Sequence, residues 1–295
     1  MPEVIEVLKY ADFIKTKLRG KKIIEINIDN GRYKKHGDFE HLDSLRKSLP
    51  LKITDVKTKG KFLYFVFENG MYLFSTLGLS GGWLFSKNNT FSFVDIFDHI
   101  KKEDLNAWHK RAIEHVNVEF ITEKGSLCYF DVLSYGTLKV VLTEAELTKK
   151  LNTIGPDITA KETTLEEFIK QLQKVRDDSY IGNVLLNQKV ISGMGNYLRA
   201  DILWLCKISP FRKMKDIEIN EYKKIWKAAR LLTWSKYDYT KGIELGFIDE
   251  NHYKLPEDYN REFYVYEQKE DPHGHKTKKE RLGDRYITWV PTIQR

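Results

Sequence analysis

Six short runs rich in β-branched and aromatic residues occupy the first half of the chain and limit what it can fold into. Between residues 22 and 142 they read KIIEINI, KFLYFVF, MYLFSTL, HVNVEFI, SLCYFDV and TLKVVL. Turn signals such as Asn69-Gly70 and Lys124-Gly125 separate them. Runs of this length and composition, bounded by turns, are typical of β-strands. We therefore predict that this part of the chain is mainly β-structure.

A single helix is predicted ahead of these strands. Between residues 3 and 18, apolar side chains recur at helical spacing, at Val4, Val7, Leu8, Ala11, Ile14 and Leu18. This spacing predicts a helix with one buried face. One helix followed by many strands predicts a β-sandwich or barrel against which the helix packs.

The second half of the chain has a different pattern. Thr164 and Glu167 have the spacing of a helix capping box. The helical segments that follow read LEEFIKQLQKV, YIGNVLLNQ, NYLRADILWLCK and EINEYKKIWKAARLLTWSK. Near the end, EFYVYE and RYITWV flank a highly charged turn, which predicts a β-hairpin over residues 261–291. The predicted fold class is α+β with two domains, residues 1–150 and 151–295.

Composition and charge narrow the class of protein. The net charge is +7 and the pI about 9.0, which favours a polyanionic partner, nucleic acid ahead of an anionic membrane. Ordinary solubility also explains the charge. No apolar run is long enough to span a bilayer, and the acidic N-terminus does not fit a signal peptide. Cys128 and Cys206 lie in apolar stretches and supply no disulfide framework or cysteine-ligated zinc site. We expect a soluble, intracellular protein.

The first residues carry candidate catalytic groups. If Met1 is removed, Pro2 becomes the N-terminus and its nitrogen is a secondary amine. An α-amino group has a pKa near ~8, so more of it is unprotonated at neutral pH than of a lysine side chain. Such an amine can attack an electrophilic carbon and form an iminium ion, with Glu3 moving a proton. Alternatively, proline and acids simply suit the first turn of a helix.

Four further sites are candidates for binding or catalysis. Lys61 begins an apolar strand, where lysine is often only a rim charge. Leu79 lies between glycines in a tight loop and either enters a base stack or folds back on the core. Gly195 and Asn196 precede a helix, and free N–H groups at a helix start bind phosphate. Arg285 in the hairpin suits a phosphate contact, whereas the nearby pair of His273 and His275 lacks further metal ligands.

In this order and at these separations, the segments resemble the Fpg/Nei family of DNA glycosylases. The family begins P-E-x-P-E-V after methionine removal, and residues 2–7 depart from that pattern only at Ile5. GKFL at 60–63 is similar to the family's catalytic-lysine motif, and LGLSG at 77–81 to its intercalation loop. The family's helix–two-turns–helix signature is similar to the segment LLNQKVISGMGNYLRADIL, in which NYLRA is closer to the sequence of Nei members. The resemblance covers essentially the whole chain.

Two departures from the family pattern are informative. His273, Lys276 and Val290 stand where members with a zinc finger have cysteines. The hairpin therefore resembles the zincless finger of the Nei-like branch found in vertebrates, and we suspect a relative of that branch carried by a large DNA virus. Leu133 and Tyr135 replace an arginine and a phenylalanine of the family's D-x-R-R-F-G motif, which puts the contact to the opposite base in doubt.

The resemblance implies a bifunctional DNA glycosylase and AP lyase of base excision repair. Pro2 would form a Schiff-base intermediate with the sugar, Glu3 would supply a proton, and Glu6 would support the site. The strand would then be cleaved by β,δ-elimination. The Nei-like sequence of the NYLRA motif favours oxidised pyrimidines, hydantoins and formamidopyrimidines as substrates. No metal or organic cofactor is implied.

The resemblance also assigns contacts to damaged DNA, duplex or single-stranded. The residues that would hold phosphates are Lys61, Gly195, Asn196 and Arg285. The residues that would fill the space left by the extruded base are Leu79, Leu133 and Tyr135. The protein would act as a monomer wherever its DNA lies, in the nucleus, the cytoplasm or a viral factory.

Two other interpretations stay open. A DNA-binding protein without catalysis would keep the helical module and the basic hairpin and use Pro2 only as a helix start. An RNA-binding or translation-associated protein explains the charge, but not Pro2, Glu3 and Lys61 together.

Overall fold

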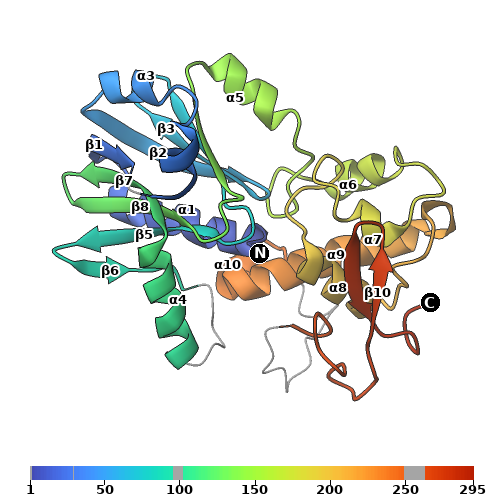
Figure 1. The fold of residues 1–295 in the computed structure, drawn as a ribbon. Coiled ribbons are helices and arrows are strands. Elements are labelled where there is room, and N and C mark those ends of the chain that lie inside the picture. The colour runs from blue at the N-terminus through green and yellow to red at the C-terminus, as the bar shows by residue number, and fades with distance from the viewer. Residues whose placement is uncertain (1, 29, 96–101, 249–262) are drawn as a thin grey trace. The chain divides into compact units, whose positions relative to one another are not determined.

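The structure is a computed structural model that describes residues 2–28, 30–95, 102–248 and 263–295. The chain divides into two units, Met1–Asn152 and Thr153–Arg295 (Figure 1). The helices of the first unit are α1 (Val4–Leu18), α2 (Gly31–His36), α3 (Leu42–Lys47), α4 (Lys102–Glu114) and α5 (Glu144–Leu151). Its strands are β1 (Lys22–Ile28), β2 (Leu51–Lys59), β3 (Phe62–Phe67), β4 (Tyr72–Thr76), β5 (Gly81–Lys87), β6 (Thr90–Ser92), β7 (Val116–Thr122), β8 (Gly125–Asp131) and β9 (Thr137–Val141).

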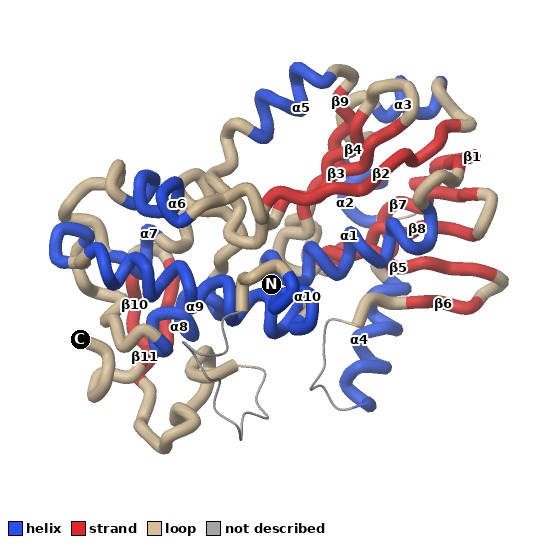
Figure 2. The backbone as a smooth tube through the Cα atoms, turned by 180° about the vertical axis from the view of Figure 1, so that it is seen from behind, coloured by secondary structure: helices blue, strands red, loops and turns tan. Residues whose placement is uncertain are grey.

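The strands of the first unit form a two-layered antiparallel structure. Their order is β6-β5-β8-β7-β1-β2-β3-β4-β9. β1 and β2 pair only at Lys22↔Lys52 and Ile23↔Leu51, so the series bends there. Figure 2 shows β2, β3, β4 and β9 as one layer and the remaining strands as the other. The predicted β-sandwich with a leading helix is therefore confirmed.

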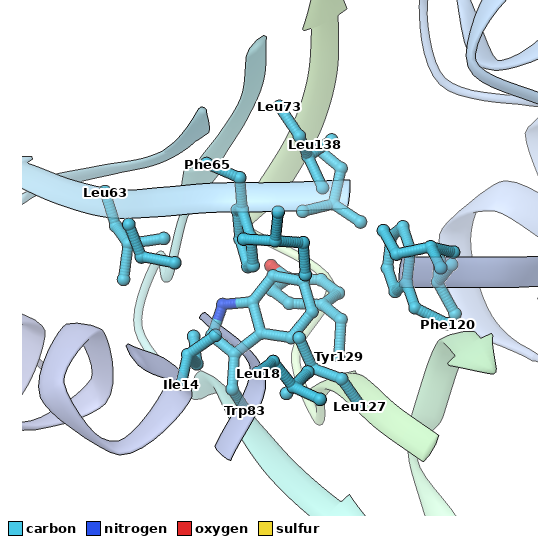
Figure 3. Packing of buried hydrophobic residues seen from close by; sticks show 14 of the residues in the cluster. Ile14, Leu18, Leu63, Phe65, Leu73, Trp83, Phe120, Leu127, Tyr129 and Leu138 are labelled. Carbon is cyan, nitrogen blue, oxygen red and sulfur yellow. The ribbon is translucent and has the colours of Figure 1, made fainter. Parts of the chain in front are cut away.

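Trp83 of β5 joins the two layers at the centre of the core (Figure 3). Its ring lies 5.2 Å from Phe65 of β3, in the other layer, and 5.1 Å from Tyr129 of β8. Its indole N–H donates to the buried Ser75 hydroxyl at 3.2 Å, so the one polar group of this side chain is satisfied. Ile14 and Leu18 of α1 pack in the same cluster, which buries the apolar face of that helix.

Gly82 of β5 allows α1 to lie close against the sheet. A Cβ atom added there would lie 2.2 Å from the Tyr10 hydroxyl and 2.6 Å from Cζ of Phe130. Tyr10 lies about two helical turns beyond Glu3, and Gly82 follows Leu79 by three residues. This contact therefore fixes the start of α1 relative to the loop that carries Leu79.

Some elements of the first unit differ from the sequence-based prediction. The six predicted strands are present, but β2, β5 and β6 are additional. β5 begins with Gly81 and Gly82, which belong to the predicted loop around Leu79. In β2, apolar residues are interspersed with polar ones because the strand is partly exposed. The prediction that Lys61 begins a strand was wrong. Lys61 lies in a two-residue turn with Gly60, whose φ of 55° suits a tight hairpin, and β3 begins at Phe62.

The second unit is helical and ends in a hairpin. Its elements are α6 (Leu165–Leu172), α7 (Ile181–Val184), α8 (Asn196–Leu205), a 3₁₀ turn (Met214–Asp216), α9 (Ile219–Tyr237), α10 (Tyr239–Glu244), β10 (Lys278–Leu282) and β11 (Arg285–Trp289). Thr164 caps α6 by accepting from the Glu167 N–H at 3.1 Å. Residues 197–204 of α8 are all buried, so this helix is the core of the unit. Of the described residues, no helix combines the length and apolar character needed to cross a membrane.

The prediction that EFYVYE forms the first hairpin strand was wrong. Residues 261 and 262 lie outside the described residues, and 263–267 form turns. The buried carboxylate of Asp201 on α8 accepts from three backbone N–H groups there, those of Tyr264, Val265 and Tyr266, at 3.0 to 3.3 Å. Because these donors bind Asp201, they do not pair with β11. The strand that pairs with β11 is β10, which lies in the segment predicted to be a charged turn.

A buried aspartate organises the loop before β10. Asp271 accepts from the Trp204 indole N–H at 3.0 Å, and its carboxylate lies 3.0 Å from Nδ1 of His275. The backbone N–H groups of His273 and His275 also donate to it. Burial raises the pKa of Asp271, but these hydrogen bonds outweigh burial and leave the pKa below its ordinary value. The loop is therefore held by a carboxylate at its centre.

We expect Asp201→Asn to destabilise the second unit by about 1–3 kcal/mol, because an amide offers one acceptor oxygen to three N–H donors. Urea unfolding measures the loss, and hydrogen exchange of the Tyr264, Val265 and Tyr266 amides should accelerate. Asp284→Asn is the matched control, since Asp284 is exposed at the hairpin tip and the change should stay within about 0.5 kcal/mol. Equal unfolding midpoints for the two variants would contradict this role of Asp201.

Candidate active site

The N-terminal groups lie at the start of α1. Glu3 is 1% exposed and is the N-cap residue, and its side chain accepts from the Glu6 backbone N–H. In return, Oε2 of Glu6 accepts from the Glu3 N–H at 2.7 Å. That N–H belongs to the peptide group that joins Pro2 to Glu3. The predicted helix start is therefore present. Glu3 directly follows the half-buried Pro2, and the Glu6 carboxylate binds the N–H of the peptide group between Pro2 and Glu3.

Lys61 lies at the end of the β2–β3 hairpin among other cations. It is half-buried in the turn between Lys59 and Phe62, which pair across the hairpin. The ammonium of Lys59 donates to the Leu151 carbonyl at the end of α5, at 2.9 Å. The ammonium of Lys150 lies 5.2 Å from the centre of the Phe62 ring. Three lysines thus gather at one end of the first unit, where a polyanion can bind.

Leu79 lies at the tip of a tight loop that leads into β5. The Gly81 N–H donates to the Leu77 carbonyl at 2.8 Å and closes the loop. Gly78 has a φ of 58°, and a Cβ atom there would lie 2.5 Å from the backbone nitrogen of Gly136. The loop therefore requires glycine at position 78, because a second loop, residues 131–136, lies directly against it.

The two loops present three exposed apolar side chains. Leu79 is 38% exposed, Leu133 51% and Tyr135 63%, although large apolar residues are usually buried. The structure thus brings together the three residues that the sequence predicts to fill a gap in DNA. Neither Leu79 nor Leu133 folds back on the core, which was the alternative for Leu79.

Asp131, which is not among the residues predicted from the sequence, holds these two loops together. The carboxylate is buried and accepts from the Ser80 hydroxyl at 2.7 Å and from the Gly136 N–H at 2.6 Å. The Leu133 N–H donates to the same hydroxyl at 2.8 Å. One buried carboxylate therefore fixes both the loop of Leu79 and the loop of Leu133 and Tyr135. The sequence signal that points to Asp131 is an acidic residue at the end of an apolar strand, five residues before Gly136.

In the second unit, Arg199 holds the predicted phosphate-binding residue Asn196. Arg199 is fully buried in α8, and its guanidinium donates to Oδ1 of Asn196 at 2.7 Å. It also donates to the carbonyls of Gly182, at 2.8 Å, and Tyr286, at 3.1 Å. Tyr286 directly follows Arg285, which is exposed at the start of β11. Arg199, which is not among the residues predicted from the sequence, therefore links Asn196 to the strand of Arg285.

Gln188 shapes the turns that lead to Gly195. Its side-chain oxygen accepts from the Gly193 N–H at 3.0 Å, and its amide donates to the carbonyls of Leu186 and Met194. Gly195 is then the N-cap residue of α8, and the helix begins at Asn196. No group of three or more His, Cys, Asp or Glu that could hold a metal ion occurs among the described residues.

Two family models match these two parts of the chain. Residues 1–138 match the formamidopyrimidine-DNA glycosylase N-terminal domain, and residues 154–234 match the formamidopyrimidine-DNA glycosylase H2TH domain. The chain belongs to the Fpg/Nei family of DNA glycosylases. The resemblance seen in the sequence is therefore confirmed. As a member of this family, the glycosylase acts in base excision repair and has the AP lyase activity that goes with the family.

Relatives and solved structures agree with this assignment. Formamidopyrimidine-DNA glycosylase of Lactobacillus gasseri is 27% identical over 228 residues, which cover 77% of this chain and 74% of that protein. Endonuclease 8 of an Enterobacter species is 27% identical over 256 residues, 85% of this chain and 83% of that protein. The crystal structure of Lactococcus lactis Fpg, bound non-covalently to DNA with an AP site, matches with a TM-score of 0.73 at 22% identity, over 100% of both chains. The predicted α+β two-domain fold is confirmed.

We expect Asp131→Asn to weaken insertion of the two loops into DNA, because the amide cannot accept from both the Ser80 hydroxyl and the Gly136 N–H. Excision under single-turnover conditions should slow on the order of tenfold, about 1.4 kcal/mol. Fluorescence of 2-aminopurine placed beside the lesion measures insertion directly. Ser80→Ala should produce a smaller loss that is not additive with that of Asp131→Asn. Additive losses, or insertion unchanged in Asp131→Asn, would contradict this positioning role.

Proposed function

We propose that the glycosylase excises oxidised bases from DNA with the amine of Pro2 as nucleophile and then cleaves the strand. The observation that carries this proposal is the position of Pro2 at the start of α1, directly before the buried Glu3, whose backbone N–H donates to the carboxylate of Glu6. The contact of Tyr10 with Gly82 fixes this helix start relative to the Leu79 loop. The proposed nucleophile and the residues proposed to fill the DNA gap thus belong to the same unit, Met1–Asn152.

The first step requires that Met1 has been removed. The unprotonated Pro2 nitrogen attacks C1′ of the deoxyribose, the glycosidic bond breaks, and the base leaves with the bonding electron pair. A carboxylate beside the amine accepts the proton that the nitrogen loses on bond formation. Two carboxylates lie within this helix start, and we assign the direct role to Glu3 and the supporting role to Glu6.

The following steps open the sugar and cut the strand. Glu3 protonates the ring oxygen O4′, the C1′–O4′ bond breaks, and a charged iminium forms between Pro2 and C1′. The iminium withdraws electrons and acidifies the C2′ proton. Loss of this proton expels the 3′ phosphate by β-elimination, and a second elimination expels the 5′ phosphate. Water finally releases the amine from the remaining sugar fragment.

The residues that hold DNA come from both units. Phosphates on either side of the lesion would bind to Lys61, Gly195, Asn196 and Arg285. Support comes from the lysines that gather around Lys61 and from the buried Arg199, which orients Asn196. Residues 1–150 would form the catalytic domain, and residues 151–295 the DNA-binding domain with a zincless finger. Metal analysis of the purified protein tests the last point.

The damaged nucleotide must leave the duplex to reach Pro2. Extruding a base costs a few kcal/mol, less for a damaged pair, and leaves a gap in the stack. Leu79, Leu133 and Tyr135 are apolar, exposed and adjacent, so they can fill that gap. The relatives named formamidopyrimidine-DNA glycosylase support formamidopyrimidines as substrates, and the solved complex of Lactococcus lactis Fpg with DNA that contains an oxidised pyrimidine supports oxidised pyrimidines. Excision assays on a panel of defined lesions test this range.

We expect borohydride to trap a covalent adduct between the protein and DNA that contains an oxidised pyrimidine. A variant with a short N-terminal extension should trap at least 100-fold less, because the Pro2 nitrogen is then an amide with no nucleophilic lone pair. A protease site in the extension provides the control, since cleavage that exposes Pro2 should restore trapping. An extended protein that traps as well as the processed one would remove Pro2 from the mechanism and favour a helix start without catalytic function.

We expect Glu3→Gln to lose 10²- to 10⁴-fold in the rate of base excision, because glutamine neither accepts nor donates the proton that each step moves. The amide oxygen can still accept the helix-capping hydrogen bond, so the fold should persist. Binding to duplex DNA with a tetrahydrofuran site should therefore change less than threefold. Excision at the rate of the unmodified protein would show that Glu3 is only a helix cap.

A further inference from the structure

Helix α2 carries basic side chains beside the loop of Leu133 and Tyr135. Arg32, Lys35 and His36 are spaced three and four residues apart and therefore share one face of the helix. All three are exposed, whereas Tyr33 is buried. This helix, with the sequence GRYKKH, has no role in the mechanism described above.

Hydrogen bonds fix α2 to the loop. The Tyr33 hydroxyl accepts from the Leu138 N–H at 2.5 Å, directly after the loop. The Arg32 backbone N–H donates to Oδ1 of the buried Asn117 at 3.1 Å, and the Asn117 amide lies 3.5 Å from the Asp131 carbonyl. A Cβ atom at Gly31 would lie 1.7 Å from the same Oδ1, so only glycine permits this approach. Arg32 is therefore held in a defined position relative to Leu133 and Tyr135.

The guanidinium of Arg32 has capacity for a ligand. Its Nη1 lies 3.5 Å from the Gly136 carbonyl, which is the outer limit of a hydrogen bond. Arg32 makes no ion pair within residues 2–28, 30–95, 102–248 and 263–295. Asp131 is the nearby acid, and its carboxylate already accepts from Ser80 and Gly136. Since a guanidinium has five N–H donors in a planar fork, most of them are available.

We propose that Arg32 binds a DNA backbone phosphate beside the base pair into which Leu79, Leu133 and Tyr135 insert. This inference rests on the proposed function, because it requires that these side chains enter DNA. The apolar tips carry no charge, so the loops themselves cannot neutralise the phosphates on either side of the gap. The planar fork of arginine matches a phosphate in a bidentate manner, and Lys35 adds charge on the same face. α2 is thus a DNA contact that fixes how far the loops enter.

The test is the salt dependence of binding to duplex DNA with a tetrahydrofuran site. Each phosphate neutralised by the protein contributes about −0.9 to the slope of log K against log salt concentration. Arg32→Gln should make the slope shallower by about 0.9 and weaken binding on the order of tenfold at physiological salt. Arg32→Lys should keep the slope but weaken binding, since it retains charge without the fork. Arg46→Gln is the control, because Arg46 pairs with Asp38 at 3.2 Å, and its slope should equal that of the unmodified protein.

Neutral methylphosphonates, placed one at a time around the lesion on both strands, locate the contact. At the position that Arg32 contacts, the methylphosphonate should weaken binding by the unmodified protein. It should not weaken binding by Arg32→Gln any further, because that variant has already lost the contact. If no such position exists and the salt-dependence slope of Arg32→Gln equals that of the unmodified protein, α2 does not contact DNA. In that case, a lowered thermal unfolding midpoint of Arg32→Gln would show that Arg32 contributes only to stability. Borohydride trapping by the unmodified protein separates the two proposals. Trapping with an unchanged slope overturns only the α2 contact, whereas failure to bind or trap damaged DNA overturns the proposed function as well.

Discussion

The contact between α1 and β5 at Gly82 determines where Pro2 and the start of α1 lie relative to the sheet. Because position 82 has no side chain, the Tyr10 hydroxyl occupies the space where a Cβ atom would stand. The next residue, Trp83, fills the centre of the core and contacts both layers of the sandwich. The same short strand begins directly after the Leu79 loop. Packing in the core and placement of the candidate active site are therefore set by the same residues.

Buried charged groups position the candidate DNA-contacting groups in both units. Asp131 fixes the loops of Leu79, Leu133 and Tyr135, and Arg199 fixes Asn196 and the backbone next to Arg285. A buried charge is costly unless hydrogen bonds satisfy it, so it tolerates few alternative arrangements of its partners. This gives each exposed group a defined geometry without placing the charge itself at the DNA surface.

The sequence allowed prediction of those helices and strands whose formation depends on the residues within the element itself. Helix α1 and the six apolar strands follow from the spacing and composition of their residues. The motifs around Pro2, Glu3 and Lys61 make these residues candidates, and their roles stay predictions. β10 was missed because its sequence, KKERL, is almost entirely charged and its strand pairing depends on β11. EFYVYE has a strand-like composition, but Asp201 binds its backbone N–H groups. Local patterns do not show which groups Asp131 and Arg199 join, because Ser80 and Tyr286 lie 51 and 87 residues away from them in the chain.

In the proposed mechanism, the Pro2 nitrogen becomes bonded to C1′ of the deoxyribose during turnover. The most direct measurement is peptide mapping by mass spectrometry of the borohydride-reduced adduct, after digestion of both protein and DNA. The proposed mechanism predicts that the added sugar mass lies on the N-terminal peptide, that fragmentation assigns it to Pro2, and that Met1 is absent. A sugar mass on Lys61, or on any other lysine, with an unmodified Pro2 would contradict it.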